Sequence, residues 1–125
     1  MPSNVEGDPG YVEMPPFTLQ NGATGTGNGT AMTMDAKTES LNVTVSGGIA
    51  TVIPEHSFDA GSTWELAVMQ DLTTGAAALV TTITAAVAPQ RFIYKHVPGA
   101  NRFRMRISAF VSGAITSTAI ERRFG

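Results

Sequence analysis

The chain has no cysteine, few charged residues and no long apolar run. The lack of cysteine excludes disulfide bonds and thiolate metal sites and leaves the redox compartment unreadable. Charged residues make up 14% of the chain and hydrophobic residues 42%, so the chain is globular but has few charges to cover a free surface. This composition suits a protein that packs against neighbours. Apolar runs such as Ala76–Val80 are too short to span a membrane, and the N-terminal residues predict no secretory signal.

The few charges are unevenly distributed along the chain. Residues 1–90 hold nine acids and one base, Lys37, whereas residues 91–125 hold seven bases and one acid, Glu121. The two halves either pair with each other within one fold or pair between subunits, which would steer assembly.

Proline and glycine divide the chain into an arm and one domain. Residues 1–16 carry four prolines, two glycines and no periodic apolar face, which predicts an extended N-terminal arm. Such an arm either frays or lies across a neighbouring subunit. Residues 17–125 alternate apolar and polar side chains between turn signals, which predicts a single β-domain.

The alternation predicts eight to ten short strands and no helix. The expected fold class is therefore all-β, an antiparallel β-sandwich or jelly roll. Gly47-Gly48 and Ser112-Gly113 are predicted to be turns at which the chain reverses. The face of the last strand that is buried stays open, because its alternation is weak. The predicted strands cover residues 17–20, 30–34, 40–46, 49–53, 63–69, 76–88, 90–97, 101–111 and 114–120.

The stretch Ser57–Trp64 has the spacing S-x-D-x-G-x-T-W, in which each residue type has a local role. The carboxylate of Asp59 is expected to accept main-chain N–H groups two or three residues on. Gly61 supplies the positive φ of a tight turn, and the indole of Trp64 can lie over the hairpin. The spacing resembles the Asp-box, a β-hairpin motif best known from sialidases and also found in other β-proteins. The predicted structural turn consists of Ser57, Asp59, Gly61, Thr63 and Trp64.

Three arginines at period two form the strongest charged feature, the arginine row of Arg102, Arg104 and Arg106. The row is interpreted as a solvated outer face, an interface that binds an acidic partner, or a nucleic-acid site. The isoelectric point near 5.5 argues against nucleic acid. Arg91 and Lys95 on the preceding strand complete the candidate interface.

No residue in the chain is predicted to be catalytic, to bind a cofactor or to bind a metal. A sialidase-like propeller repeats its blade several times, whereas this chain has one Asp-box in 125 residues, and Tyr11 and Tyr94 provide no recognisable nucleophile with a partner glutamate. No acid–base pair is evident, so no enzymatic activity is expected. His56 lies beside Glu55 and is interpreted as a solvated histidine at a strand end rather than a metal ligand.

The run Arg104–Thr116 reads R-x-R-x-S-A-x-x-S-G-x-[IV]-T. Together with the Asp-box and the Thr-, Ala- and Gly-rich strands, it makes residues 17–120 similar to small β-sandwich virion proteins of tailed bacteriophages. Ala60 departs from this pattern, because related turns often carry a second glycine there. The resemblance implies no catalytic residues and no cofactor, and an oligomer placed by virion symmetry.

The resulting hypothesis is a non-enzymatic virion structural protein, assembled in the host cytoplasm. The first form is a capsid decoration or cement protein, a dimer or trimer that docks on the major capsid protein across subunit joints. Its alternatives are a tail, fibre or carbohydrate-binding module that recognises the host, and a head–tail or tail-tube component. No membrane partner is expected.

Overall fold

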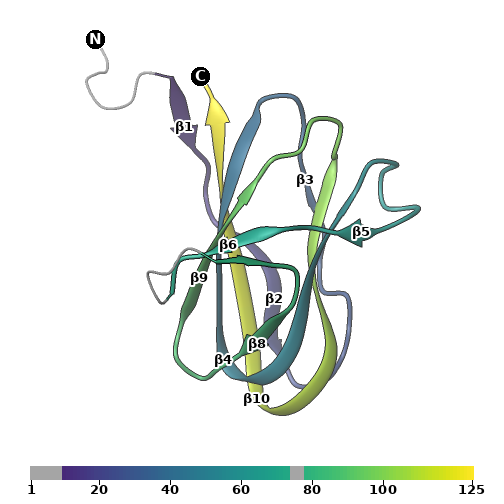
Figure 1. The fold of residues 1–125 in the computed structure, drawn as a ribbon, viewed down its shortest axis with the longest axis vertical. Coiled ribbons are helices and arrows are strands. Elements are labelled where there is room, and N and C mark those ends of the chain that lie inside the picture. The colour runs from purple at the N-terminus through teal and green to yellow at the C-terminus, as the bar shows by residue number, and fades with distance from the viewer. Residues whose placement is uncertain (1–9, 74–77) are drawn as a thin grey trace.

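Two long strands organise the fold, β4 (Thr38–Ser57) and β10 (Arg102–Phe124), in a computed structural model that describes residues 10–73 and 78–125. They pair antiparallel along almost their whole length, and Gly48 faces Gly113 midway. Figure 1 shows both strands running down the molecule, bending at its lower end and returning upwards. The bend folds one hydrogen-bonded sheet into two layers that face each other.

Eight shorter strands complete the sheet among the described residues. β9 pairs with the first half of β4, whereas β5 and β8 pair with its second half. β1 and β2 pair with the last half of β10, and β3 pairs with its first residues. All pairings are antiparallel, so the prediction of an all-β fold is confirmed. The short strands are β1 (Tyr11–Glu13), β2 (Phe17–Ala23), β3 (Met32–Thr33), β5 (Glu65–Leu66), β6 (Met69–Asp71), β7 (Leu79–Val80), β8 (Ile83–Ala85) and β9 (Gln90–Lys95).

The core lies between the two layers and follows the period-two pattern of the strands. Every second residue of Leu41–Val45 is buried, and so is every second residue of Phe103–Ile107. The last strand buries Ile115 and Ala119, which answers the question that its weak alternation left open. The rings of Tyr94 on β9 and Phe103 on β10 lie 4.8 Å apart and join the layers.

The predicted hairpin turns at Gly47-Gly48 and Ser112-Gly113 are wrong, because both segments lie inside continuous strands. The chain does change direction there, but by a bend in two paired strands rather than by a turn between separate strands (Figure 1). The glycines serve a close approach of two backbones. A Cβ on Gly48 would lie 2.4 Å from the carbonyl oxygen of Ser112, and a Cβ on Gly113 would lie 2.5 Å from that of Gly47. Register shifts on both sides of the contact supply the bend. The prediction of short strands throughout therefore fails here, where four predicted strands merge into two of 20 and 23 residues.

Two other predicted segments differ in detail from the structure. The single strand expected at residues 76–88 is two short strands, β7 and β8, and residues 74–77 lie outside the described residues. Of the predicted arm, residues 1–9 also lie outside the described residues, while Tyr11–Glu13 forms β1 along the end of β10. In the described part of the chain there is no helix of the length and apolarity that crossing a membrane requires.

Candidate functional site

The turn at Ser57–Trp64, here called the Asp-box turn after the motif that its spacing resembles, is closed by two side chains, those of Ser57 and Asp59. The Ser57 hydroxyl accepts the N–H of Gly61 at 2.8 Å and donates to the Asp59 carboxylate at 2.7 Å. Asp59 in turn accepts both the N–H of Thr63 at 2.8 Å and its hydroxyl at 2.6 Å. The carboxylate thus reaches four residues on, rather than the two or three expected from an Asx turn, because the serine takes the nearer N–H groups.

These hydrogen bonds stabilise the charged form of Asp59. The hydroxyl of Thr63, the hydroxyl of Ser57 and the N–H of Thr63 lower the pKa of Asp59 to about 2. The carboxylate is therefore ionised at neutral pH and satisfied by the turn itself. It has a structural role and is not a free acid.

The turn is anchored to the start of β10 by Asn101. The side-chain oxygen of Asn101 accepts a hydrogen bond from the backbone N–H of Ala60 at 3.0 Å. The backbone N–H of Asn101 donates to the carbonyl of Ser57 at 2.8 Å. Ala60 has φ of 60° and Gly61 has φ of 93°, so two consecutive residues are left-handed. Sequence reasoning missed Asn101, because nothing local links it to a turn 41 residues earlier.

Trp64 lies outside the core, between the turn and the arginine row. Its ring is in van der Waals range of a Cβ built on Gly61, and the guanidinium of Arg104 lies 4.0 Å from the ring centroid. The indole therefore covers the turn, as expected, and also supports Arg104 by a cation–π contact. The strand that follows begins at Glu65 rather than at Thr63.

Glu55 forms ion pairs with two members of the arginine row. It lies directly opposite Arg104 in the β4–β10 register and is only 7% exposed. Its two carboxylate oxygens accept the Nε–H groups of Arg104 at 2.8 Å and Arg106 at 3.2 Å. The third member, Arg102, donates to the carbonyl of Asn101 at 2.8 Å. Glu55 is a site residue that the cross-strand pairing of opposite charges could have suggested.

Arg91 and Lys95 do not extend the arginine row. They lie on β9, which pairs with the first half of β4, whereas the row pairs with the second half. Lys95 forms an ion pair with Glu39, and its hydrogen bond is the main cause that lowers the pKa of Glu39. The structure thus brings together three of the five candidate interface residues and places the other two in the opposite layer.

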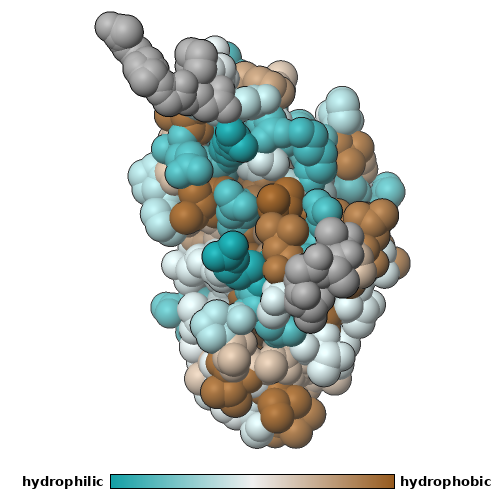
Figure 2. All heavy atoms as spheres, turned by 60° about the vertical axis from the view of Figure 1, so that its left-hand side comes forward, coloured by the Kyte–Doolittle hydropathy of each residue, from teal (hydrophilic) through white to brown (hydrophobic). Residues whose placement is uncertain are grey.

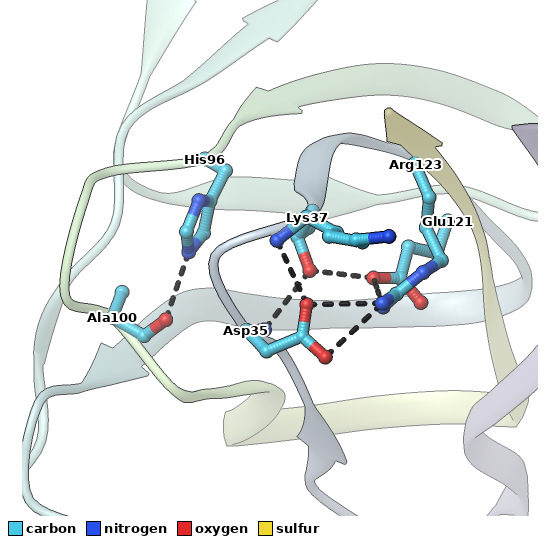
Figure 3. Close-up of polar contacts among 7 residues, drawn as sticks. Asp35, Lys37, His96, Ala100, Glu121 and Arg123 are labelled. Atoms are coloured by element: carbon cyan, nitrogen blue, oxygen red, sulfur yellow. Dashed lines mark hydrogen bonds and ion pairs between the residues drawn. The ribbon is translucent and has the colours of Figure 1, made fainter. Parts of the chain in front are cut away.

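A second charge cluster joins the start of β4 to the end of β10 (Figure 3). Arg123 contacts Glu121 at 3.0 Å and the carboxylate of Asp35 at 3.1 Å, and the Thr38 hydroxyl donates to Glu121 at 2.5 Å. The hydrogen bond from the N–H of Lys37 is the largest cause that lowers the pKa of Asp35, and the hydrogen bond from Arg123 is the second. Acids from the first part of the sequence thus pair with bases from the last part inside one chain.

His56 is a buried residue, and its interpretation as a solvated histidine is wrong. It is 7% exposed, its Nδ1 lies 2.7 Å from the Tyr94 hydroxyl, and its ring packs edge-on against Phe58. Burial lowers the pKa of His56 and raises that of Tyr94 to about 12. His96 contacts the carbonyl of Ala100 at 2.8 Å. No group of three potential metal ligands occurs among the residues that the structure describes.

A groove of about 560 Å³ opens between the end of β9 and the segment that crosses from β5 to β6. Its wall is largely apolar and includes Leu66, Val68 and Leu79. Two of its titratable side chains, His56 and Lys95, already bind Tyr94 and Glu39. Among the described residues that line it, the groove thus offers apolar surface but no pair of free acids or bases for chemistry.

No protein-family model and no curated protein sequence matches the chain. Two solved structures share its fold. The SPBc2 prophage-derived protein YomS aligns with a TM-score of 0.75 and 14% identity, over 90% of this chain and 94% of YomS. The PBSX exported protein XepA aligns with a TM-score of 0.76 and 15% identity, over 90% of this chain and 38% of XepA. The chain therefore has the fold of nearly all of YomS and of one part of XepA.

Proposed function

We propose that the protein is a non-enzymatic structural protein of a bacteriophage, a decoration protein that docks across subunit joints of the capsid. The observation that carries the proposal is the fold shared with two phage-derived proteins, one of them over 94% of its length. A fold that this chain shares with nearly all of one such protein supports a phage role.

The internal pairing of charges supports a role in adhesion. Glu39, Glu55 and Glu121 are each less than 10% exposed, and each binds a base of the same chain. Such groups stabilise a rigid body but are not free to act as general acids or bases. Charged residues make up only 14% of the chain, which lowers the desolvation cost of burying its surface against a lattice.

Mass spectrometry and imaging of purified phage particles test the proposal. A capsid decoration protein is expected to co-purify with the particles in a fixed ratio to the major capsid protein. Electron cryo-microscopy is then expected to show it in repeated copies on the head. Its absence from particles that contain all other structural proteins would contradict the proposal.

The N-terminal arm provides a second test of docking. The variant lacking residues 1–9 retains β1, whose Tyr11 ring packs against Phe124 and against the guanidinium of Arg122. If the arm ties neighbours together, this variant binds capsids more weakly at unchanged thermal stability. Equal binding by the truncated and full-length proteins would show that residues 1–9 play no part in attachment.

A second candidate function follows from the name of one neighbour. XepA is an exported protein, so we also consider a phage protein that acts outside the particle. Fractionating an infected culture separates the two functions. Particle-bound protein supports decoration, whereas protein found free in the medium and missing from particles supports export.

A further inference from the structure

Three segments meet at the bend of the sheet and form its lower end. They are residues 46–50 of β4, residues 108–114 of β10 and residues 85–89, which begin at the last residue of β8. These three segments are here called the apolar pole. Ala50 pairs with Phe110 on one side and with Ala85 on the other. The N–H of Gly47 donates to the carbonyl of Val87 at 3.1 Å, which ties the third segment to the bend.

The apolar pole exposes large side chains and contains no ionisable residue. Val111 is 70% exposed, Val87 68% and Ile49 43%. Figure 2 shows hydrophobic residues at the lower tip of the molecule, below a middle part where hydrophilic residues are frequent. Clusters of this kind on a monomer indicate an interaction surface, because each exposed apolar side chain favours burial.

The backbone under these side chains is fixed by steric contacts. A Cβ on Gly47 would lie 2.1 Å from the carbonyl oxygen of Ala114, so the two strands touch without side chains between them. The side chains of the apolar pole are therefore presented on a preorganised surface, which lowers the entropic cost of binding.

We propose that the apolar pole docks a second copy of this chain, pole to pole across a two-fold axis. A two-fold contact places a surface patch against its own copy, so any charge near the axis meets a like charge. The apolar pole has none, whereas the far ends of β4 and β10 carry the ion pairs of Glu39, Glu55 and Glu121. A patch without charge is compatible with its own copy.

The contact is made by side chains rather than by extension of the sheet. Within the described residues, no strand pairs with residues 108–114 on the side away from β4. This open edge is interrupted by register shifts and by the positive φ of Gly113, features that oppose regular strand pairing. Val87, Val111 and Ile49 then form the centre of the contact. A contact centred on three large side chains is small beside a standard interface of about 20–30 residues and about 800 Å² per partner, so micromolar or weaker self-association is expected.

Sedimentation equilibrium of the full chain over about 10 µM to 1 mM tests the proposal. The wild type is expected to show a monomer–dimer equilibrium. Val111→Asp and Val87→Asp each place two like charges at the two-fold contact and should weaken the dimer at least about tenfold. Leu79→Asp is the matched control: Leu79 is 74% exposed on β7, outside the apolar pole, and its substitution adds the same charge. This control should leave the equilibrium unchanged.

Several results would overturn the proposal. They include a wild-type monomer throughout the concentration range, a dimer that survives Val111→Asp, or an equal loss with Leu79→Asp. A monomer that binds neutral phosphatidylcholine vesicles, with binding lost in Val111→Asp, would assign the apolar pole to a lipid surface instead. The measurement is independent of the phage particle, so the self-contact and the decoration function can each fail alone.

Discussion

The strand ends of the β4–β10 pair and the bend midway along it differ in what fixes their structure. At the strand ends, charged side chains from distant parts of the chain bind one another, as Glu55 binds Arg104 and Glu121 binds Arg123. At the bend, residues without charge are held by backbone contacts between glycines. The strand ends are therefore specified by complementary charged side chains. The bend is specified by glycines, which lack a side chain and let the two backbones touch. The difference also separates a surface whose charges are paired within the chain from one that exposes uncharged apolar side chains.

The largest effect is expected from Gly47→Ala at the bend. A Cβ there would meet the Ala114 carbonyl oxygen at 2.1 Å, at a φ of 100° that side chains rarely adopt. Because the neighbour is backbone of a paired strand, relief requires the bend to open, and we expect a loss of about 3 kcal/mol or more. Urea denaturation measures the loss. Gly25→Ala is the matched control, since its Cβ would meet nothing within 4 Å, and a change of less than about 0.5 kcal/mol is expected. Similar losses in both variants would contradict the steric explanation.

The next largest effect is expected from Glu55→Gln at the charged end. The substitution leaves Arg104 and Arg106 without their carboxylate, although one neutral hydrogen bond remains available. The side chain of Arg106 is 32% exposed and is partly screened by water. We therefore expect the free energy of unfolding to fall by about 2 kcal/mol, which is less than the loss for a fully buried pair. A double-mutant cycle with Arg104→Gln measures the coupling. Glu65→Gln, at an exposed position of β5, serves as the control and should be nearly neutral. A coupling near zero would show that the ion pair adds no stability.

The sequence could predict structure that depends on local spacing. The Asp-box residues Ser57, Asp59 and Thr63 lie within seven positions, and their side chains do close a turn. The alternation of Leu41, Val43 and Val45 likewise predicted a buried face. Both inferences needed only neighbouring residues, which is why they succeeded.

The sequence could not predict features that depend on distant partners. Gly47-Gly48 gives the same local signal for a reversal as for a bend, and the close approach of Gly113 in the partner strand decides between them. The arginine row resembled a free charged surface, because its partner Glu55 lies about 50 residues earlier. The sequence therefore predicted the spacing of the arginine row, whereas its pairing with Glu55 and the separation of Arg91 and Lys95 from it needed the fold.

Stability at the charged end should also depend on pH through His56. Burial is the main cause that lowers the pKa of His56 below its ordinary value of 6.5, with His96 adding to the effect and Glu65 opposing it. The unfolded chain then binds a proton more readily than the folded protein. Stability should be constant with respect to this residue above that value and fall as the pH is lowered below it. Denaturation between pH 7.5 and pH 5, the latter still above the usual pKa of carboxylates, measures the slope. His56→Gln should reduce the slope and His96→Gln should largely retain it; an unchanged slope in His56→Gln would assign the effect to other groups.

The smallest change in stability is expected from Ala60→Gly, because Ala60 has a strained backbone but no steric clash of its side chain with a partner strand. Ala60 has φ of 60°, where a Cβ is unfavourable, and its position is exposed. Glycine removes that strain but gains freedom in the unfolded chain, so a net gain of about 0.5 kcal/mol in stability is expected.

Gly61→Ala is the reverse experiment: its Cβ would meet only the Trp64 ring, at 3.5 Å, so the loss of about 1 kcal/mol reflects backbone conformation alone. That loss should be clearly smaller than the loss from Gly47→Ala, which adds a clash with a partner strand. If the two losses were equal, close packing of the backbones would not be what distinguishes the bend from the Asp-box turn.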